Sequence, residues 1–81
     1  MAAIYLSGPA IAALRSTHRV TENQAMRRGH YGPVVWRDRI AYVAQSAVER
    51  RAGLRFTPEQ IARAVASVAA RMITVAPPAE D

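Results

Sequence analysis

The sequence predicts an all-α domain built from four helices, two long and two short. Apolar residues recur at helical spacing, Ser or Thr precedes three of the four expected helices, and Gly29 and Gly53 each follow a run that contains two arginines. With 81 residues the chain forms one domain with a small core, since a chain of this size buries only about 60% of the surface that its unfolded form exposes. We therefore expect residues 1–81 to form a single unit, with residues 76–81 frayed at its end.

The first short helix is expected at about residues 9–16. Pro9 suits the first helical position because it has no amide hydrogen, and Ser7 or Gly8 serves as the N-cap. Ile11 lies on the side of the helix that is expected to be buried. The letters AIYL just before it are interpreted as an extended segment or a loose lead-in to the helix.

The second short helix is expected at about residues 22–28. Thr21 is its predicted N-cap, Gln24 follows three residues later, Met26 points inward and Gly29 ends the helix. The letters GHYGP then form a turn. A helix-turn-helix motif over the two short helices fits poorly, because its turn has no glycine and its second helix is short.

The first long helix is expected at about residues 34–52. Its buried stripe consists of Trp36, Ile40, Val43, Ala44, Ala47 and Val48. Two arginines in its last turn compensate the negative end of the helix dipole, and Gly53 follows in the left-handed conformation.

The second long helix is expected at about residues 58–74 and has the clearest signals. Thr57 and Gln60 form a capping box around Pro58, and Phe56 packs on the first turn as a hydrophobic staple. Its buried stripe consists of Ile61, Val65, Val68 and Met72. The short connection between the two long helices predicts an antiparallel hairpin.

Composition limits the classes of function. All eleven basic residues are arginine and the formal net charge is +5, so the protein is expected to attract polyanions. There is no cysteine, which excludes disulfides and thiolate chemistry and fits a cytoplasmic location. The apolar first fourteen residues lack the preceding positive charges of a signal peptide and are too short to span a bilayer, so we expect them in the core and expect no membrane association.

Catalysis is not expected from this sequence. Four acidic residues of the body, Glu22, Asp38, Glu49 and Glu59, fall at polar helix positions or first turns rather than in pairs. The two histidines are twelve residues apart with no cysteine nearby, which is not a metal-ligand spacing. The prediction is a non-enzyme without metal or cofactor.

Nucleic-acid binding is the first functional hypothesis, with duplex DNA as the favoured target of a small regulatory or accessory protein. It requires the C-terminal ends of the two short helices to lie side by side and form one positive patch. The same arginines would also occur if they served only to compensate helix dipoles. The predicted patch consists of Arg15, His18, Arg19, Arg27, Arg28, His30 and Tyr31.

Binding of a partner protein is the alternative hypothesis. The predicted helical hairpin is rich in alanine and would expose apolar surface on its flanks, which favours a homodimer with a shared four-helix core. Trp36 and Tyr42 are the expected aromatic contacts of this interface, with Tyr42 the more exposed of the two.

Overall fold

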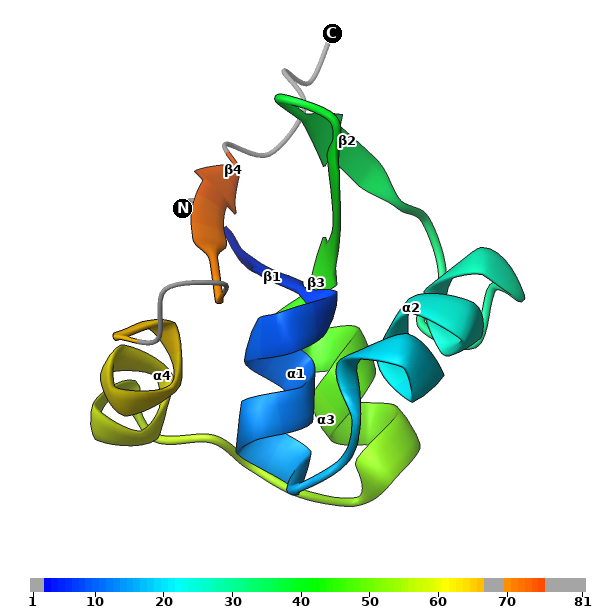
Figure 1. Cartoon of the computed structure of the whole chain (residues 1–81). Helices are drawn as coiled ribbons and strands as arrows, with labels where there is room; N and C mark the ends of the chain where they lie inside the picture. Colours follow the sequence, from blue (N-terminus) through cyan, green and yellow to red (C-terminus); the bar gives the residue numbers. More distant parts are fainter. Residues whose placement is uncertain (1–2, 67–69, 76–81) are drawn as a thin grey trace, which may run out of the picture.

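The protein has a mixed α/β fold, so the all-α prediction is wrong. The computed structural model describes residues 3–66 and 70–75, and the strands form one antiparallel sheet with the order β2-β3-β1-β4. In Figure 1 the sheet occupies the upper part of the molecule and the helices gather below it. The elements are β1 (Ala3–Ser7), α1 (Gly8–Arg15), α2 (Arg19–Arg27), β2 (Val35–Arg37), β3 (Ile40–Ala44), α3 (Gln45–Ala52), α4 (Pro58–Val65) and β4 (Met72–Val75).

The first helix is confirmed, and the extended interpretation of the segment before it is the correct one. Strand β1 runs directly into α1 at Ser7, whose hydroxyl accepts a hydrogen bond from the Ala10 amide at 3.4 Å. The same hydroxyl accepts a second hydrogen bond from the Arg71 amide at 2.9 Å. One buried serine therefore caps α1 and fixes the segment that leads into β4.

The second helix begins earlier than predicted. Helix α2 starts at Arg19, and His18 is its N-cap through a hydrogen bond that its Nδ1 accepts from the Val20 amide at 3.2 Å. Thr21 lies inside the helix and is not its cap. Gly29 follows the helix with φ of +76°, which agrees with its predicted role in ending it.

The prediction of a long helix over residues 34–52 is wrong for the first half of that range. Residues 35–44 form the hairpin of β2 and β3, and only Gln45–Ala52 are helical, as α3. The hairpin turns through Asp38 and Arg39, which both have positive φ, as in a type I′ turn. Gly53 ends α3 in the left-handed conformation, as predicted.

The capping box of the last helix is confirmed, but that helix is shorter than predicted. Thr57 accepts a hydrogen bond from the Gln60 amide, and the Gln60 side chain accepts one from the Thr57 amide. Helix α4 ends at Val65, and Met72 belongs to β4 instead of the helical stripe. The predictions for Val68 and for the tail at 76–81 lie outside the described residues. The antiparallel pair of long helices is therefore absent.

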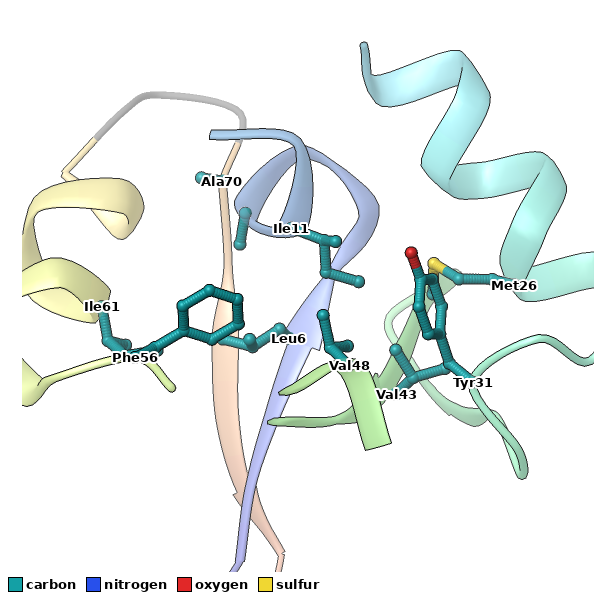
Figure 2. Packing of buried hydrophobic residues seen from close by; sticks show 10 residues of the cluster. Leu6, Ile11, Met26, Tyr31, Val43, Val48, Phe56, Ile61 and Ala70 are labelled. Atoms are coloured by element: carbon teal, nitrogen blue, oxygen red, sulfur yellow. The ribbon is translucent and has the colours of Figure 1, made fainter. Parts of the chain in front are cut away.

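The core lies between the sheet and the helices. In Figure 2, Phe56 and Ile61 fill the side near α4, Leu6, Ile11 and Val48 occupy the middle, and Met26, Tyr31 and Val43 fill the side near α2. Leu6 and Val43 sit opposite each other on β1 and β3, so they share the face of the sheet that the helices cover. Burial of Leu6 and Ile11 agrees with the prediction that the N-terminal segment belongs to the core.

None of the helices in the described part of the chain combines the length and the apolar character needed to cross a membrane.

Candidate nucleic-acid interface

The two short helices are arranged differently from what the predicted arginine patch requires. Helix α2 runs back along α1. Thr17, between the two helices, donates a hydrogen bond to Glu22. The last turn of α2 lies at the start of α1, where Arg27 and Gly8 line one pocket. The end of α1 therefore adjoins the start of α2 and not its end. Arg15 ends α1 and contacts Glu22 in the first half of α2. Arg27 is the last residue of α2, a nine-residue helix about 13 Å long.

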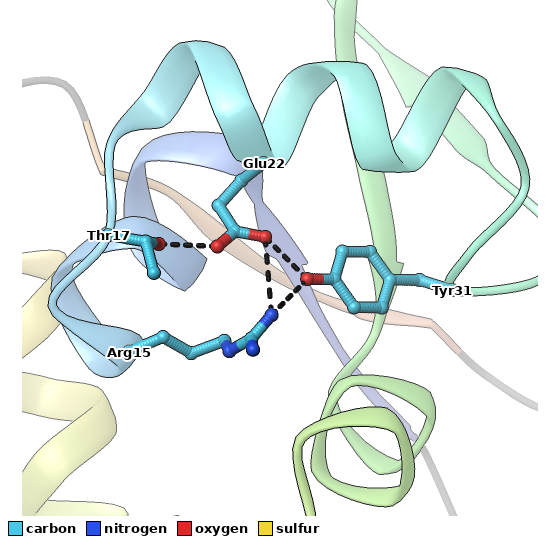
Figure 3. Close-up of polar contacts among 4 residues, drawn as sticks. All are labelled: Arg15, Thr17, Glu22 and Tyr31. Carbon is cyan, nitrogen blue, oxygen red and sulfur yellow. Dashed lines mark hydrogen bonds and ion pairs between the residues drawn. The ribbon is translucent and has the colours of Figure 1, made fainter.

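Arg15 is partly buried and paired within the protein, and it is not part of an open patch. Figure 3 shows Arg15, Thr17, Glu22 and Tyr31 as one polar network. The Arg15 guanidinium donates to the Tyr31 hydroxyl at 2.7 Å and lies 3.7 Å from Oε1 of Glu22. Thr17 and Tyr31 each donate a short hydrogen bond to the Glu22 carboxylate. The charge of Arg15 is thus compensated by a carboxylate that is only 1% exposed.

Tyr31 is likewise part of the interior. Its ring is in the core cluster and its hydroxyl faces Glu22. Burial, and then the hydrogen bond to the Glu22 carboxylate, raises the pKa of Tyr31 above its ordinary value, while the nearby Arg15 acts in the opposite direction. Tyr31 is therefore placed to hold Glu22 and not to stack on a ligand.

The other residues of the predicted patch are exposed but spread along the molecule. His18 and Arg19 lie at the start of α2, whereas Arg27 is in its last turn and Arg28 is the C-cap. His30 follows in the turn after the helix and is exposed as well. Arg27 lines a pocket shared with the β2–β3 hairpin. His30 lines a different pocket, together with Tyr5 and Ala44 of the sheet.

That pocket has a volume of about 520 Å³ and lies between α2, the start of α1 and the β2–β3 hairpin. This volume falls in the range of small-ligand sites, which is roughly 300–1,000 Å³. Its wall is mainly apolar, and its polar groups come from three residues on two elements. The residues that line the pocket include Asn23, Met26, Arg27, Trp36, Arg39 and Ala41.

Trp36 is the most exposed large apolar residue of the described chain, at 64%. The strand register explains its position, because Trp36 pairs with Ala41 on β3 and therefore shares the face of Leu6 and Val43. The helices cover this face at Leu6 and Val43 but leave it open at Trp36. The prediction that Tyr42 is the more exposed aromatic residue is wrong, since Tyr42 is only 4% exposed.

Arg27 and Arg39 bring two uncompensated charges to the same pocket. Neither guanidinium has an ion-pair or hydrogen-bond partner among residues 3–66 and 70–75, and both residues are exposed. Arg39 is held at a φ of +67°, a conformation that costs about 1 kcal/mol for a residue with a Cβ atom. Such strain is found more often at functional sites than elsewhere.

No protein-family model, curated protein or solved structure matches this chain. Its function is therefore inferred from its own residues. Within the described part of the chain, no group of three or more His, Asp or Glu side chains is arranged to hold a metal ion.

Arg39 and Asn23 were missed as site residues by the sequence analysis. Both face the pocket only because residues 35–44 form a hairpin that returns toward α2. A helix over the same residues would place Arg39 three positions from Trp36 on a solvated surface. The one local signal was the β-branched and aromatic run VVW, which is typical of a strand.

Proposed function

We propose that the protein is a small accessory or regulatory protein that binds nucleic acid across α2 and the β2–β3 hairpin. One observation carries the proposal: Arg27 and Arg39, from different elements and without an ion-pair or hydrogen-bond partner among residues 3–66 and 70–75, line one pocket with the exposed Trp36. Arginine forks bind phosphate oxygens in a bidentate manner, and aromatic faces stack on bases. The proposal describes binding and includes no catalytic step.

The surrounding charge supports this surface. Arg28, the C-cap of α2, is also exposed and lies next to Arg27 in the chain. The acidic residues of α2 and the hairpin are Glu22, which is buried and paired, and Asp38 in the hairpin turn. Near the pocket the exposed arginines Arg27, Arg28 and Arg39 therefore outnumber Asp38, the one exposed acid of α2 and the hairpin, which favours a polyanion.

A partner protein is the second candidate, and Trp36 supports it. Exposed tryptophan is enriched among the residues that contribute most to protein interfaces. The uncovered helical hairpin that suggested a homodimer is absent, and Tyr42 is buried, so Trp36 alone remains of the predicted interface. Nucleic acid is favoured because Arg27 and Arg39 line the same pocket as this tryptophan.

The proposal is tested by measuring binding to labelled oligonucleotides, single-stranded and duplex, over a range of salt concentrations. Each phosphate contact contributes a slope of roughly −0.9 (duplex) or −0.7 (single strand) to log affinity against log salt. The double variant Arg27→Gln/Arg39→Gln should bind more weakly and flatten the slope by about 1.8 units for a duplex or about 1.4 units for a single strand.

The matched control is Arg55→Gln/Arg63→Gln, which removes the same charge from exposed residues away from this pocket. Its salt slope should stay within about half a unit of the wild-type value, since neither arginine contacts phosphate in the proposed complex. Equal losses in both double variants would show that only net charge matters, and absence of binding to any oligonucleotide would overturn the proposal.

A further inference from the structure

We infer that the pocket holds one unstacked base of a single-stranded nucleic acid, seated against Trp36, with the flanking phosphates at Arg27 and Arg39. This inference rests on the proposed function and specifies the ligand of the same pocket. It differs from the expectation of duplex DNA, which depended on a patch that the structure does not contain.

The lining of the pocket suits a flat aromatic ring. Trp36 forms one wall, and its neighbour across the hairpin is Ala41, whose methyl group leaves the adjacent surface uncovered. Met26 from α2 contributes to the apolar part of the lining. Base–aromatic stacking stabilises complexes with single strands and tolerates any base, because every base has a π-face.

The positions of the charges fit a strand that passes through the pocket. Arg27 approaches from the last turn of α2 and Arg39 from the turn of the hairpin, so the guanidinium groups enter from two different elements. A backbone on either side of a seated base presents one phosphate in each direction. Two separate cations at an apolar pocket suit this arrangement better than a neutral peptide segment.

Asn23 adds a group that can read a base edge. It stands one helical turn before Arg27, lines the pocket, and forms no side-chain hydrogen bond with another residue in the described ranges 3–66 and 70–75. Its amide oxygen lies so close to Gly8 that a Cβ atom there would approach it to 1.9 Å. Asn23 is thus packed at the rim with an amide that can both donate and accept.

A duplex cannot use the pocket in this way, because its bases are paired and stacked on their neighbours. Extruding one base from the duplex costs a few kcal/mol. The inference therefore predicts tighter binding of a single strand than of a duplex of the same sequence.

The test uses the fluorescence of Trp36, which is the sole tryptophan of the chain. Wild-type protein is titrated with an unlabelled single-stranded oligonucleotide, as DNA and as RNA, and with the corresponding duplex. Anisotropy of labelled copies of the same oligonucleotides measures binding independently. We expect saturable quenching of Trp36 by a single strand, with the affinity that anisotropy gives, and at least about tenfold weaker binding of the duplex.

Two substitutions separate stacking from charge. Trp36→Ala should lower single-strand affinity about 5- to 100-fold and leave duplex affinity nearly unchanged, whereas Trp36→Phe should recover much of the loss because it keeps an aromatic face. Circular dichroism of both variants checks that the fold is retained.

The outcomes distinguish this inference from the proposed function. Binding seen by anisotropy with unchanged Trp36 emission, or equal affinity for single strand and duplex, overturns the base-seating inference while nucleic-acid binding stands. Absence of binding to every oligonucleotide overturns both. Preference for RNA or for DNA identifies the sugar, and either preference supports the inference if Trp36 is quenched.

Discussion

Glu22 accepts a hydrogen bond from the hydroxyl of Tyr31, and both side chains are buried. The pair joins α2 to the turn that follows it, and Arg15 at the end of α1 completes the contact. A buried carboxylate is tolerated only when it is paired and hydrogen-bonded, and here three donors surround it. The network therefore stabilises the packing of α1 against α2, and it pairs the charge of Arg15 with a buried carboxylate.

Arg15→Ala should lower the free energy of unfolding by about 2–3 kcal/mol. Breaking a fully buried ion pair costs about 3–5 kcal/mol, and the Arg15 side chain is 28% exposed, so water compensates part of the loss. Chemical denaturation measures the change. The double variant Arg15→Ala/Glu22→Gln should lose less stability than the sum of the losses in the two single variants, because both substitutions disrupt the same contact. Strictly additive losses would contradict the network.

Tyr31→Phe should change how stability depends on pH. The folded protein raises the pKa of Tyr31 above 10.0, so the proton is bound more tightly in the folded state. The stability from this difference is fully present below pH 10 and is lost as the pH rises through the folded pKa. Denaturation midpoints measured between neutral and alkaline pH should therefore fall less steeply in Tyr31→Phe. Tyr42→Phe is the control, and a decline in Tyr31→Phe as steep as that of the control would count against the account.

Ser7→Ala should destabilise the fold by about 1–2 kcal/mol. The Ser7 hydroxyl is buried and accepts from the amides of Ala10 and Arg71, so its removal leaves two donors without this acceptor. Thermal unfolding measures the loss, and Ser46→Ala at an exposed position of α3 serves as the control. Similar melting temperatures for the two variants would show that the cap contributes little.

Arg39→Gly should affect stability and binding in opposite directions. Glycine adopts the positive φ of this turn without a steric penalty, so the free energy of unfolding should rise by about 0.5–1 kcal/mol. The same change removes a cation from the pocket, so nucleic-acid affinity should fall. Asp38→Asn keeps Arg39 and removes the neighbouring acid, and its affinity should equal or exceed that of the wild type. Joint loss of stability and affinity in Arg39→Gly would contradict the proposed role.

The helix ends were predictable because their signals are local. Ser7, the capping box of Thr57 and Gln60, and the left-handed Gly53 all act within one turn of chain, and all are found as predicted. The prediction of Thr21 as the N-cap was wrong, because His18, three residues earlier, supplies Nδ1 as the acceptor.

The sheet was not predictable by periodicity. The apolar run from Ile40 to Ala44 fits one side of a helix as well as a buried strand, and short apolar runs do not separate the two. The usual hairpin signal, Asn-Gly or Asp-Gly, is replaced by Asp38-Arg39. The β-branched residues Ile73, Thr74 and Val75 favoured a strand at β4, but Met72 continued the helical spacing of α4.

The candidate site depended on the sheet and was therefore only partly predictable. Arg27 and Trp36 were selected from the sequence for two different surfaces, and the hairpin brings them to one pocket. Arg15, Tyr31 and Tyr42 are held in the interior or in its polar network, which the spacing of arginines and aromatics does not reveal.

The most direct test of the pocket is the NMR spectrum of ¹⁵N-labelled protein during addition of a short single-stranded oligonucleotide. The single tryptophan gives one indole N–H signal. We predict that this signal and the backbone amides of Asn23 and Ala41 shift together with one dissociation constant. Shifts confined to the surface around Arg50, Arg51 and Arg55, with the Trp36 indole unchanged, would contradict the account.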